Sequence, residues 1–196
     1  ADISSAAFFI AAALLVPGSE LLLKNIGINP TRDGFLRIVK EMGANITLMN
    51  EHSEGGEPVA DILVKHSRLH GVTIGGSIIP TLIDEIPILC VLAAYAEGTT
   101  TITDAAELKF KESDRIAVMC DNLTAIGIKA TATDDGMIID GCEKIIGGTV
   151  QSANDHRIAM SFAVAALNSE NGIEINNPEC ISISYPNFFN TLKDLQ

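Results

Sequence analysis

The chain has 196 residues, of which 47% are hydrophobic, and its formal net charge at pH 7 is -12. This length and composition are sufficient for a buried core and exclude a disordered chain. Nucleic-acid binding is disfavoured, because phosphate backbones are held by clustered Lys and Arg, whereas the 13 such residues here are spread along the sequence.

The first predicted helix covers residues 5–15 and follows Asp2, which is expected to cap its N-terminus. It is apolar on nearly every side, which predicts an interior helix. The apolar run from Ala6 to Pro17 is shorter than the roughly 20 residues that span a bilayer, so we expect no membrane association. Because the sequence starts at Ala1, directly before this helix, we expect it to be a piece of a longer polypeptide.

An acidic residue followed by an apolar helix occurs three times in the sequence. Asp84 and Asp155 precede predicted helices 85–96 and 156–167 as expected N-caps. Pro87 supports this assignment, because a proline is tolerated in the first turn of a helix. A glycine after each of the three helices is expected to end it, and these glycines are Gly18, Gly98 and Gly172.

Each apolar helix is followed by a strand and a second helix. The strands expected after the glycines are 20–26, 99–103 and 173–176. The second helices are expected to begin at the caps Thr31, Ser113 and Ser184. Further strands are expected at 45–49, 61–65, 72–75, 128–133, 137–139 and 149–152, with an exposed loop at 53–58.

This order of elements is a repeated α-β-α-β-β unit and predicts one compact domain, residues 1–196, built from three similar units. The first helix of each unit is expected inside, with the sheets around it. If the units are related by rotation, the N-termini of their helices meet at one end of the molecule.

Two cations flank a carboxylate at the start of a second helix, in the order Lys111, Glu112 and Arg115. Their charges add to the positive end of a helix dipole, which suits a phosphate or carboxylate ligand. The alternative is a solvated run of charges, whose surface ion pairs contribute roughly 0 to 1 kcal/mol. Side chains at the other helix starts are expected to converge on the same place, namely Asp84, His156 and Arg157.

The cysteines and the remaining histidines give no sign of a metal site. The cysteines occur singly, which is typical of reduced, buried thiols in a cytosolic protein, and they are Cys90, Cys120, Cys142 and Cys180. The other histidines show no metal-ligand spacing and are expected at the surface, and they are His52, His66 and His70.

Six segments carry a resemblance to a known family. They are Asp-Ile-Ser-Ser-Ala-Ala-Phe-Phe at 2–9, Gly-Ile-Asn-Pro-Thr-Arg at 27–32, Asp-Glu-Ile-Pro at 84–87, Glu-Leu-Lys-Phe-Lys-Glu-Ser-Asp-Arg-Ile at 107–116, Asn-Asp-His-Arg-Ile-Ala-Met at 154–160 and Ser-Tyr-Pro-Asn-Phe-Phe at 184–189. The chain resembles the EPSP synthases (3-phosphoshikimate 1-carboxyvinyltransferases), most closely their glyphosate-tolerant bacterial group. The likeness runs from end to end but covers only the C-terminal half of such an enzyme.

The resemblance implies an α/β (α+β) fold, the enolpyruvyl transferase-like domain of three β-α-β-α-β-β units with interior helices and outer sheets. It also implies transfer of the enolpyruvyl group of phosphoenolpyruvate to the 5-hydroxyl of shikimate 3-phosphate in the shikimate pathway of aromatic amino acid biosynthesis. Neither a metal nor an organic cofactor is implied. The absent N-terminal domain would supply further substrate contacts, so the isolated chain is expected to fold but to be inactive.

The roles of the candidate residues follow from their match to the family motifs. Glu112 matches the catalytic residue that transfers a proton at the methylene carbon of phosphoenolpyruvate. Asp84 matches the acidic residue that contacts the ring hydroxyls of shikimate 3-phosphate and acts there as a base or orients the reacting hydroxyl. The matched substrate-binding residues around the phosphate and carboxylate groups are Lys111, Arg115, His156 and Arg157. Asp114 and Asp155 are expected to cap helices or to orient these cations.

One position departs from part of the family. Ile183 stands where glyphosate-sensitive members carry a lysine, so the contacts to phosphoenolpyruvate are expected to differ there, with glyphosate as an expected inhibitor. Two other functions remain open at this point. One is a UDP-N-acetylglucosamine 1-carboxyvinyltransferase-like enzyme, and the other is a non-catalytic binding module of the same fold.

Overall fold

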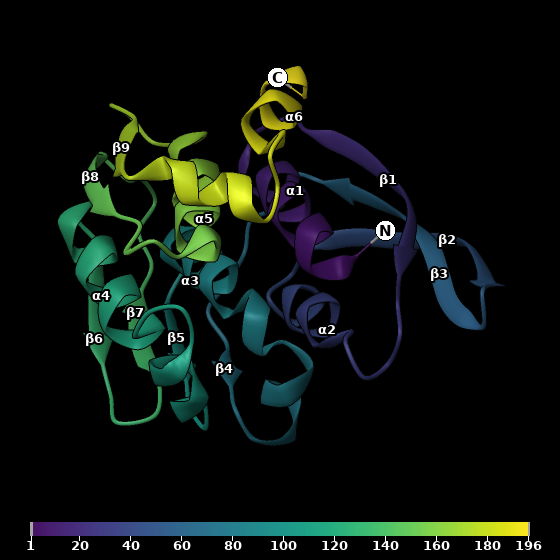
Figure 1. Ribbon diagram of the computed structural model, residues 1–196, viewed down its shortest axis with the longest axis horizontal. Helices are drawn as coiled ribbons and strands as arrows, with labels where there is room; N and C mark the ends of the chain where they lie inside the picture. The colour runs from purple at the N-terminus through teal and green to yellow at the C-terminus, as the bar shows by residue number, and fades with distance from the viewer. Residues whose placement is uncertain (1, 196) are drawn as a thin grey trace.

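Three apolar helices form the interior of the computed structural model, which describes residues 2–195 (Figure 1). They are α1 (Ile3–Leu15), α3 (Ile86–Tyr95) and α5 (His156–Ala166). Each contacts the other two, and nearly all residues of α1 and α3 are buried. The prediction that the first helix of each unit lies inside is therefore confirmed, because a helix without a polar face is stable only when it is surrounded.

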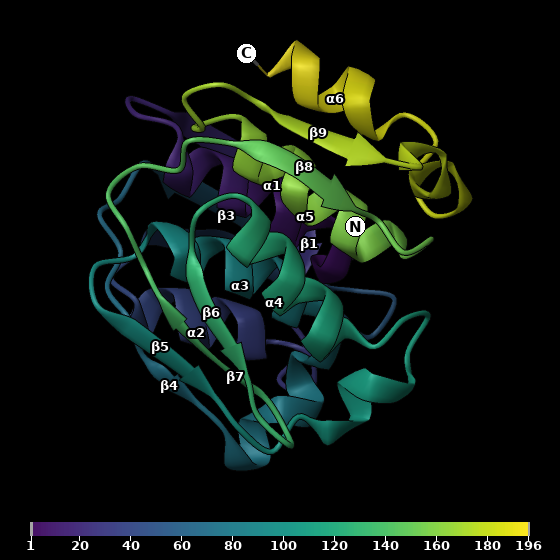
Figure 2. The ribbon, with the colours of Figure 1, turned by 90° about the vertical axis from the view of Figure 1, so that its left-hand side faces the viewer.

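The sheets lie around these helices, with the second sheet and the β8–β9 pair on the outside in Figure 2. The first sheet has the order β1-β3-β2, with β1 (Glu20–Gly27), β2 (Asn45–Glu54) and β3 (Glu57–Lys65). The second has the order β4-β5-β7-β6, with β4 (Thr73–Ile74), β5 (Thr99–Ile102), β6 (Lys129–Ala132) and β7 (Met137–Asp140). In the third, β8 (Gly148–Gln151) pairs in parallel with β9 (Ile173–Asn176).

The repeat seen in the sequence is also present in the pairing of the strands. In the first two sheets the last strand of a unit lies between its two predecessors and pairs antiparallel with both. The second helices are α2 (Gly34–Glu41), α4 (Arg115–Ala125) and α6 (Phe188–Asp194). Four 3-10 helices complete the described part of the chain: η1 (Gly76–Thr81), η2 (Ile83–Glu85), η3 (Ala106–Phe110) and η4 (Pro178–Ile183).

Two of the three expected acidic caps are confirmed. Asp2 accepts the backbone N–H of Ser5 at 3.1 Å, and Asp155 accepts that of Arg157 at 3.0 Å. The prediction for Asp84 is wrong: it lies within η2, two residues before the first residue of α3, and Glu85 occupies the N-cap position. The extra 3-10 turn moves the start of α3 past Asp84 and leaves its carboxylate free for other partners.

The expected caps of the second helices are wrong as well, and two of these residues bond to other side chains instead. Thr31 bonds to Asn29 in a turn, and Ser113 donates its hydroxyl proton to Asp155 at 3.0 Å. Ser184 ends η4. The observed N-cap residues are Asp33 for α2, Asp114 for α4 and Asn187 for α6. They follow the expected caps by two, one and three positions.

The loop expected at residues 53–58 is a tight hairpin instead. β2 continues to Glu54 and β3 begins at Glu57, so only Gly55 and Gly56 form the turn. Both glycines have positive φ values, 61° and 87°, which suits the two-residue turns that join antiparallel strands. Glycine makes such a turn accessible without steric cost, and the strands therefore extend further than the sequence pattern predicts.

The expectation of buried thiols is confirmed for three of the four cysteines and is wrong for Cys142. All four cysteines lie in the described range and are free; three are buried, and Cys142 is half-buried. Within residues 2–195 we find no helix with the length and hydrophobicity of a membrane span.

Tyr95→Phe is expected to lower the free energy of unfolding by about 1 kcal/mol. The Tyr95 hydroxyl donates to the carbonyl oxygen of Ala165 at 2.7 Å and joins the C-terminal ends of α3 and α5. Urea denaturation of the chain measures the effect. Tyr185→Phe is the matched control, because its ring packing on Phe9 and Phe188 remains. An equal loss in both variants would contradict the assignment.

Candidate active site

Asp84 lies at the centre of a cluster of charges formed by the starts of three helical segments. Its Oδ1 is 3.6 Å from Arg115 Nη1 and 3.7 Å from Lys111 Nζ, and its Oδ2 is 3.9 Å from Arg157 Nη2. We call Lys111, Arg115 and Arg157 the cation cluster. The predicted convergence of these positions is confirmed in the structure, and one carboxylate forms ion pairs with three cations.

Arg115 is the best fixed member of the cation cluster, with a side chain only 1% exposed. Its guanidinium makes two hydrogen bonds to Asp155, 2.8 Å from Nε and 3.2 Å from Nη2, and Nη2 also contacts Glu112 at 2.6 Å. Its Nη1 has no hydrogen-bond partner within residues 2–195. This bidentate contact sets the plane of the guanidinium and leaves one buried N–H group directed toward the Asp84 side.

Glu112 lies on the exposed side of Arg115. Its side chain is about half-exposed (48%) and its Oε2 accepts from Arg115 Nη2 at 2.6 Å. Glu112 follows η3, directly before the short turn that leads into α4, so its carboxylate is close to the cation cluster and open to solvent. A carboxylate in this position can reach a bound substrate, whereas Asp155 cannot, because its side chain is fully buried.

Asp155 has a structural role, because its carboxylate binds other groups of the protein. Burial by itself raises the pKa of this carboxyl, but the hydrogen bond and charge of Arg115, the Ser113 hydroxyl and the Arg157 N–H together hold the pKa below its usual value. Asp155 is therefore ionised, caps α5 and orients Arg115. Asp114 caps α4 through the Ala117 N–H at 3.1 Å. Both observations agree with the roles expected of these two aspartates.

His156 is the first residue of α5 and lies beside the cation cluster. Burial and the neighbouring charge of Arg157 lower the pKa of its imidazole below the ordinary value of 6.5. The ring is therefore neutral at pH 7 and can either donate or accept one hydrogen bond at a given nitrogen. Arg157 itself donates to the backbone oxygen of Asp84 at 3.3 Å, which ties the start of α5 to η2.

Three polar residues beside the site were not predicted from the sequence. The Ser4 hydroxyl donates to Glu85 Oε1, and Arg32 Nη2 donates to Ser4 Oγ at 2.9 Å. These residues lie in the segments 2–9, 84–87 and 27–32 that carry the family resemblance. The signal that could have found Glu85 is the Asp84-Glu85 pair, because only one of two adjacent carboxylates can occupy the N-cap position of the helix.

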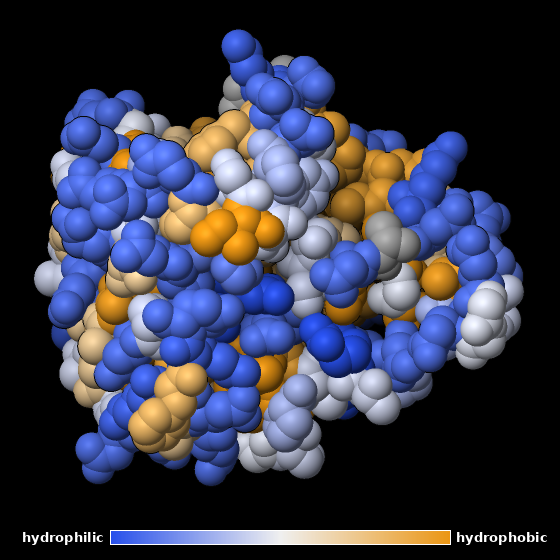
Figure 3. Space-filling view, in the orientation of Figure 1, coloured by the Kyte–Doolittle hydropathy of each residue, from blue (hydrophilic) through white to orange (hydrophobic). Residues whose placement is uncertain are grey.

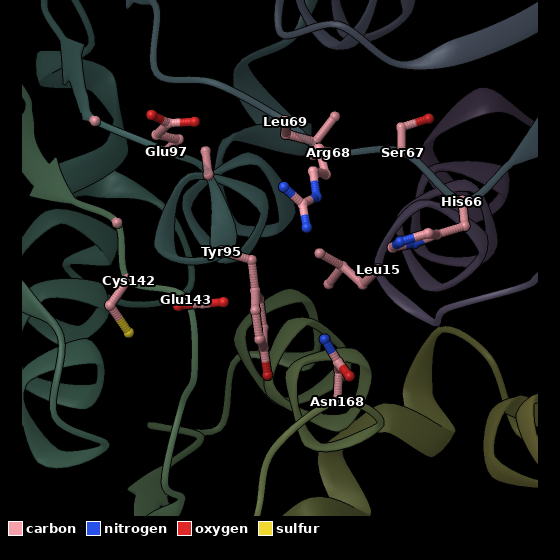
Figure 4. A pocket seen from close by; sticks show the side chains of 13 residues that line it. Leu15, His66, Ser67, Arg68, Leu69, Tyr95, Glu97, Cys142, Glu143 and Asn168 are labelled. Carbon is pink, nitrogen blue, oxygen red and sulfur yellow. The ribbon is translucent and has the colours of Figure 1, made fainter.

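The face that carries the site is largely hydrophilic (Figure 3). A separate cavity of about 500 Å³ lies at the other end of the interior helices, where α1 and α3 end (Figure 4). In Figure 4 the Arg68 guanidinium points toward the middle of the residues that line this cavity. A cation at the C-terminal ends of helices interacts favourably with their dipoles.

The family model for EPSP synthase (3-phosphoshikimate 1-carboxyvinyltransferase) matches residues 1–192 of the chain. The chain belongs to the EPSP synthase family. Its sequence is 52% identical to the 3-phosphoshikimate 1-carboxyvinyltransferase of Geobacter metallireducens over 98% of the chain and 45% of that relative. It is 57% identical to that of Synechocystis sp. over 97% of the chain and 43% of that relative. The chain thus spans less than half the length of these curated relatives.

Solved structures of EPSP synthases show the same fold. The enzyme from Acinetobacter baumannii superposes with a TM-score of 0.95 at 46% identity, over 99% of this chain and 45% of that one. The enolpyruvyl transferase NikO from Streptomyces tendae has a TM-score of 0.74 at 20% identity and shows the fold alone. The predicted α/β fold of the enolpyruvyl transferases is confirmed.

Proposed function

We propose that the chain is the C-terminal domain of a two-domain EPSP synthase and contributes half of its active site. The enzyme transfers the enolpyruvyl group of phosphoenolpyruvate to the 5-hydroxyl of shikimate 3-phosphate, in the cytoplasm. The observation that carries this proposal is the convergence of Asp84, Glu112 and the cation cluster at the starts of the helices. The names of the relatives favour shikimate 3-phosphate over a UDP-sugar as acceptor, and catalytic relatives make a purely binding module the weaker interpretation.

The cation cluster would bind the phosphate and carboxylate groups of the substrates. Arginine and lysine N–H groups stabilise such anions, and the effect is strongest where water is excluded. Lys111 is held by Glu107 at 2.6 Å, and Arg115 by Asp155 at 2.8 Å, so both cations are in place before a substrate arrives. Neutral His156 would donate a further hydrogen bond to a phosphate oxygen.

The transfer itself needs three proton transfers, which we assign to the two carboxylates. Asp84 would orient the 5-hydroxyl or accept its proton as the oxygen attacks C2 of phosphoenolpyruvate. Glu112 would deliver a proton to C3, the methylene carbon, which becomes a methyl group in the tetrahedral adduct. Return of a proton from C3 to Glu112 and loss of phosphate from C2 then give EPSP. The half-exposed position of Glu112 supports this role, because its carboxylate faces the open side of the site.

We further propose that glyphosate, which carries a phosphonate and a carboxylate, binds the same cation cluster. Ile183, which is 83% exposed, stands where glyphosate-sensitive members carry a lysine. The absence of this cation is expected to weaken inhibition, as in the tolerant bacterial group.

Reconstitution tests the proposed function. We expect this chain, mixed with the N-terminal half of the same enzyme, to release phosphate from phosphoenolpyruvate plus shikimate 3-phosphate, whereas neither half does so alone. The Glu112→Gln chain in the same mixture is the control for phosphate release by contaminating enzymes. Two folded halves that associate without releasing phosphate would contradict the proposal. Rapid turnover by this chain alone would contradict the requirement for the other half.

A further inference from the structure

Glu85 is a buried carboxylate next to Asp84 that the proposed mechanism does not use. Its side chain is only 1% exposed, and its Oε2 has no hydrogen-bond partner within residues 2–195. Its Oε1 accepts the hydroxyl proton of Ser4 and lies 3.8 Å from Arg32 Nη2, which also donates to Ser4 Oγ. Glu85 therefore joins the start of α1, the β1–α2 loop and the start of α3.

Helix capping does not explain this burial. Glu85 occupies the N-cap position of α3, but its side chain makes no hydrogen bond to the helix backbone. Burying a carboxylate is costly unless it is paired and hydrogen-bonded. Here the hydroxyl of Ser4 and the charge of Arg32 compensate only one of its two oxygens. A neutral side chain of the same shape would fill this position at lower cost, which indicates that the charge itself serves another purpose.

The local geometry connects Glu85 to Asp84. Both residues lie in η2, a single 3-10 turn, and their side chains make contacts in different directions. Glu85 contacts Ser4 and Arg32, whereas Asp84 faces the cation cluster. On the other side, Arg157 Nη1 donates to the Asp84 backbone oxygen. The turn that carries Asp84 is thus held from two sides, by the Glu85 side chain and by α5.

We propose that Glu85, held by Ser4 and Arg32, is a positioning residue that fixes the turn carrying Asp84 and so sets the direction of the Asp84 carboxylate toward the reacting hydroxyl. This inference rests on the proposed function, in which Asp84 contacts that hydroxyl. Loss of the Glu85 charge releases the pair with Arg32 and allows η2 to shift. A shift of about 1 Å in a catalytic group can cost a factor on the order of 100 in rate.

The charges around Glu85 make this role sensitive to pH. The facing groups are Ser4 on α1, Arg32 on the β1–α2 loop, Arg157 on α5 and Asp84 on its own turn. Burial raises the pKa of the Glu85 carboxyl above its usual value, and the hydrogen bond from Ser4 and the charges of the two arginines only partly offset this effect. As the pH falls through this raised pKa, Glu85 becomes neutral and its pairing with Arg32 is lost.

The test uses the full-length enzyme that contains this chain, with Glu85→Gln and the matched control Glu97→Gln, an exposed carboxylate just after the other end of α3. For Glu85→Gln we expect kcat to fall by about 10- to 100-fold, while KM for phosphoenolpyruvate stays within about twofold, because the cation cluster is retained. The acidic limb of the kcat profile should move to lower pH. Glu97→Gln should match the wild type in all three measurements.

Ser4→Ala is the second variant, because it keeps the Glu85 charge and removes only its hydrogen-bond donor. We expect a fall in kcat of a few-fold without a change in KM, and no further fall when Ser4→Ala is added to Glu85→Gln. An active wild type with unchanged kcat and pH profile in Glu85→Gln and Ser4→Ala would overturn this inference alone. A wild type that transfers no enolpyruvyl group would overturn the proposed function and, with it, this inference.

Discussion

Glu112→Gln in the full-length enzyme is expected to lower kcat for enolpyruvyl transfer by about 10²- to 10⁴-fold, the usual contribution of a positioned proton donor or acceptor. The amide has nearly the shape of the carboxylate but cannot exchange a proton with C3 of phosphoenolpyruvate. Phosphate release under saturating substrates measures kcat. Because the Glu112 side chain is half-exposed, the melting temperature should remain close to that of the wild type.

Asp121→Asn is the matched control for this prediction. Asp121 is exposed on α4, the helix that begins just after Glu112, and lies outside the cluster around Asp84. It should change kcat by less than about twofold, since surface substitutions away from a site have small effects. If Glu112→Gln kept wild-type kcat, Glu112 would not be the proton-transfer residue, and the ion pair with Arg115 would be its only role.

Asp155→Asn is expected to lower the free energy of unfolding by about 3 to 5 kcal/mol, the usual cost of removing one partner from a buried ion pair. Asparagine keeps an oxygen that can accept the Arg157 N–H, so the cap of α5 is largely retained. The buried guanidinium of Arg115, however, loses its fully buried charged partner and the 2.8 Å hydrogen bond from Nε to Oδ2, the oxygen that asparagine replaces with an amide nitrogen. Urea denaturation of the chain measures this loss.

Asp114→Asn separates this effect from helix capping. Asp114 accepts the Ala117 N–H at the start of α4, as Asp155 does for α5, but its own contacts are exposed. Its substitution should cost well under about 1 kcal/mol, because asparagine is also a good N-cap. A similar small loss for Asp155→Asn would show that the pair with Arg115 adds little to stability.

The pH dependence of stability gives an independent check on Asp155. Its pKa in the folded protein is held below its value in the unfolded chain, so its contribution is complete above about pH 4 and is lost as the pH falls through the folded-state pKa. Asp155→Asn should flatten this acid loss. The contribution of Glu85 to stability has the opposite sign. Because its pKa is raised in the folded protein, its ionised form lowers stability at neutral pH, and this loss disappears as the pH falls through that pKa.

Local chemistry determined much of the fold from the sequence alone. The apolar runs of the three interior helices, the glycines after them and the alternating strands predicted α1, α3, α5 and β9 to within a few residues. These features depend on side chains within one or two turns of each other, so a linear pattern contains them. The motif at 107–116 likewise placed Lys111, Glu112 and Arg115 at the start of a helix, where the structure has them.

Only the tertiary structure decided how the carboxylates are used. The sequence predicts that Asp84 caps a helix. In the structure Asp84 lies in an additional 3-10 turn, and its carboxylate pairs with Lys111 and Arg115 instead. Arg115 binds Asp155, 40 positions later, and Ser4 binds Glu85, 81 positions later. Such pairings depend on how the three units pack around the interior helices, because packing brings distant residues together and buries their charges, and no local pattern specifies which partner each charge will find.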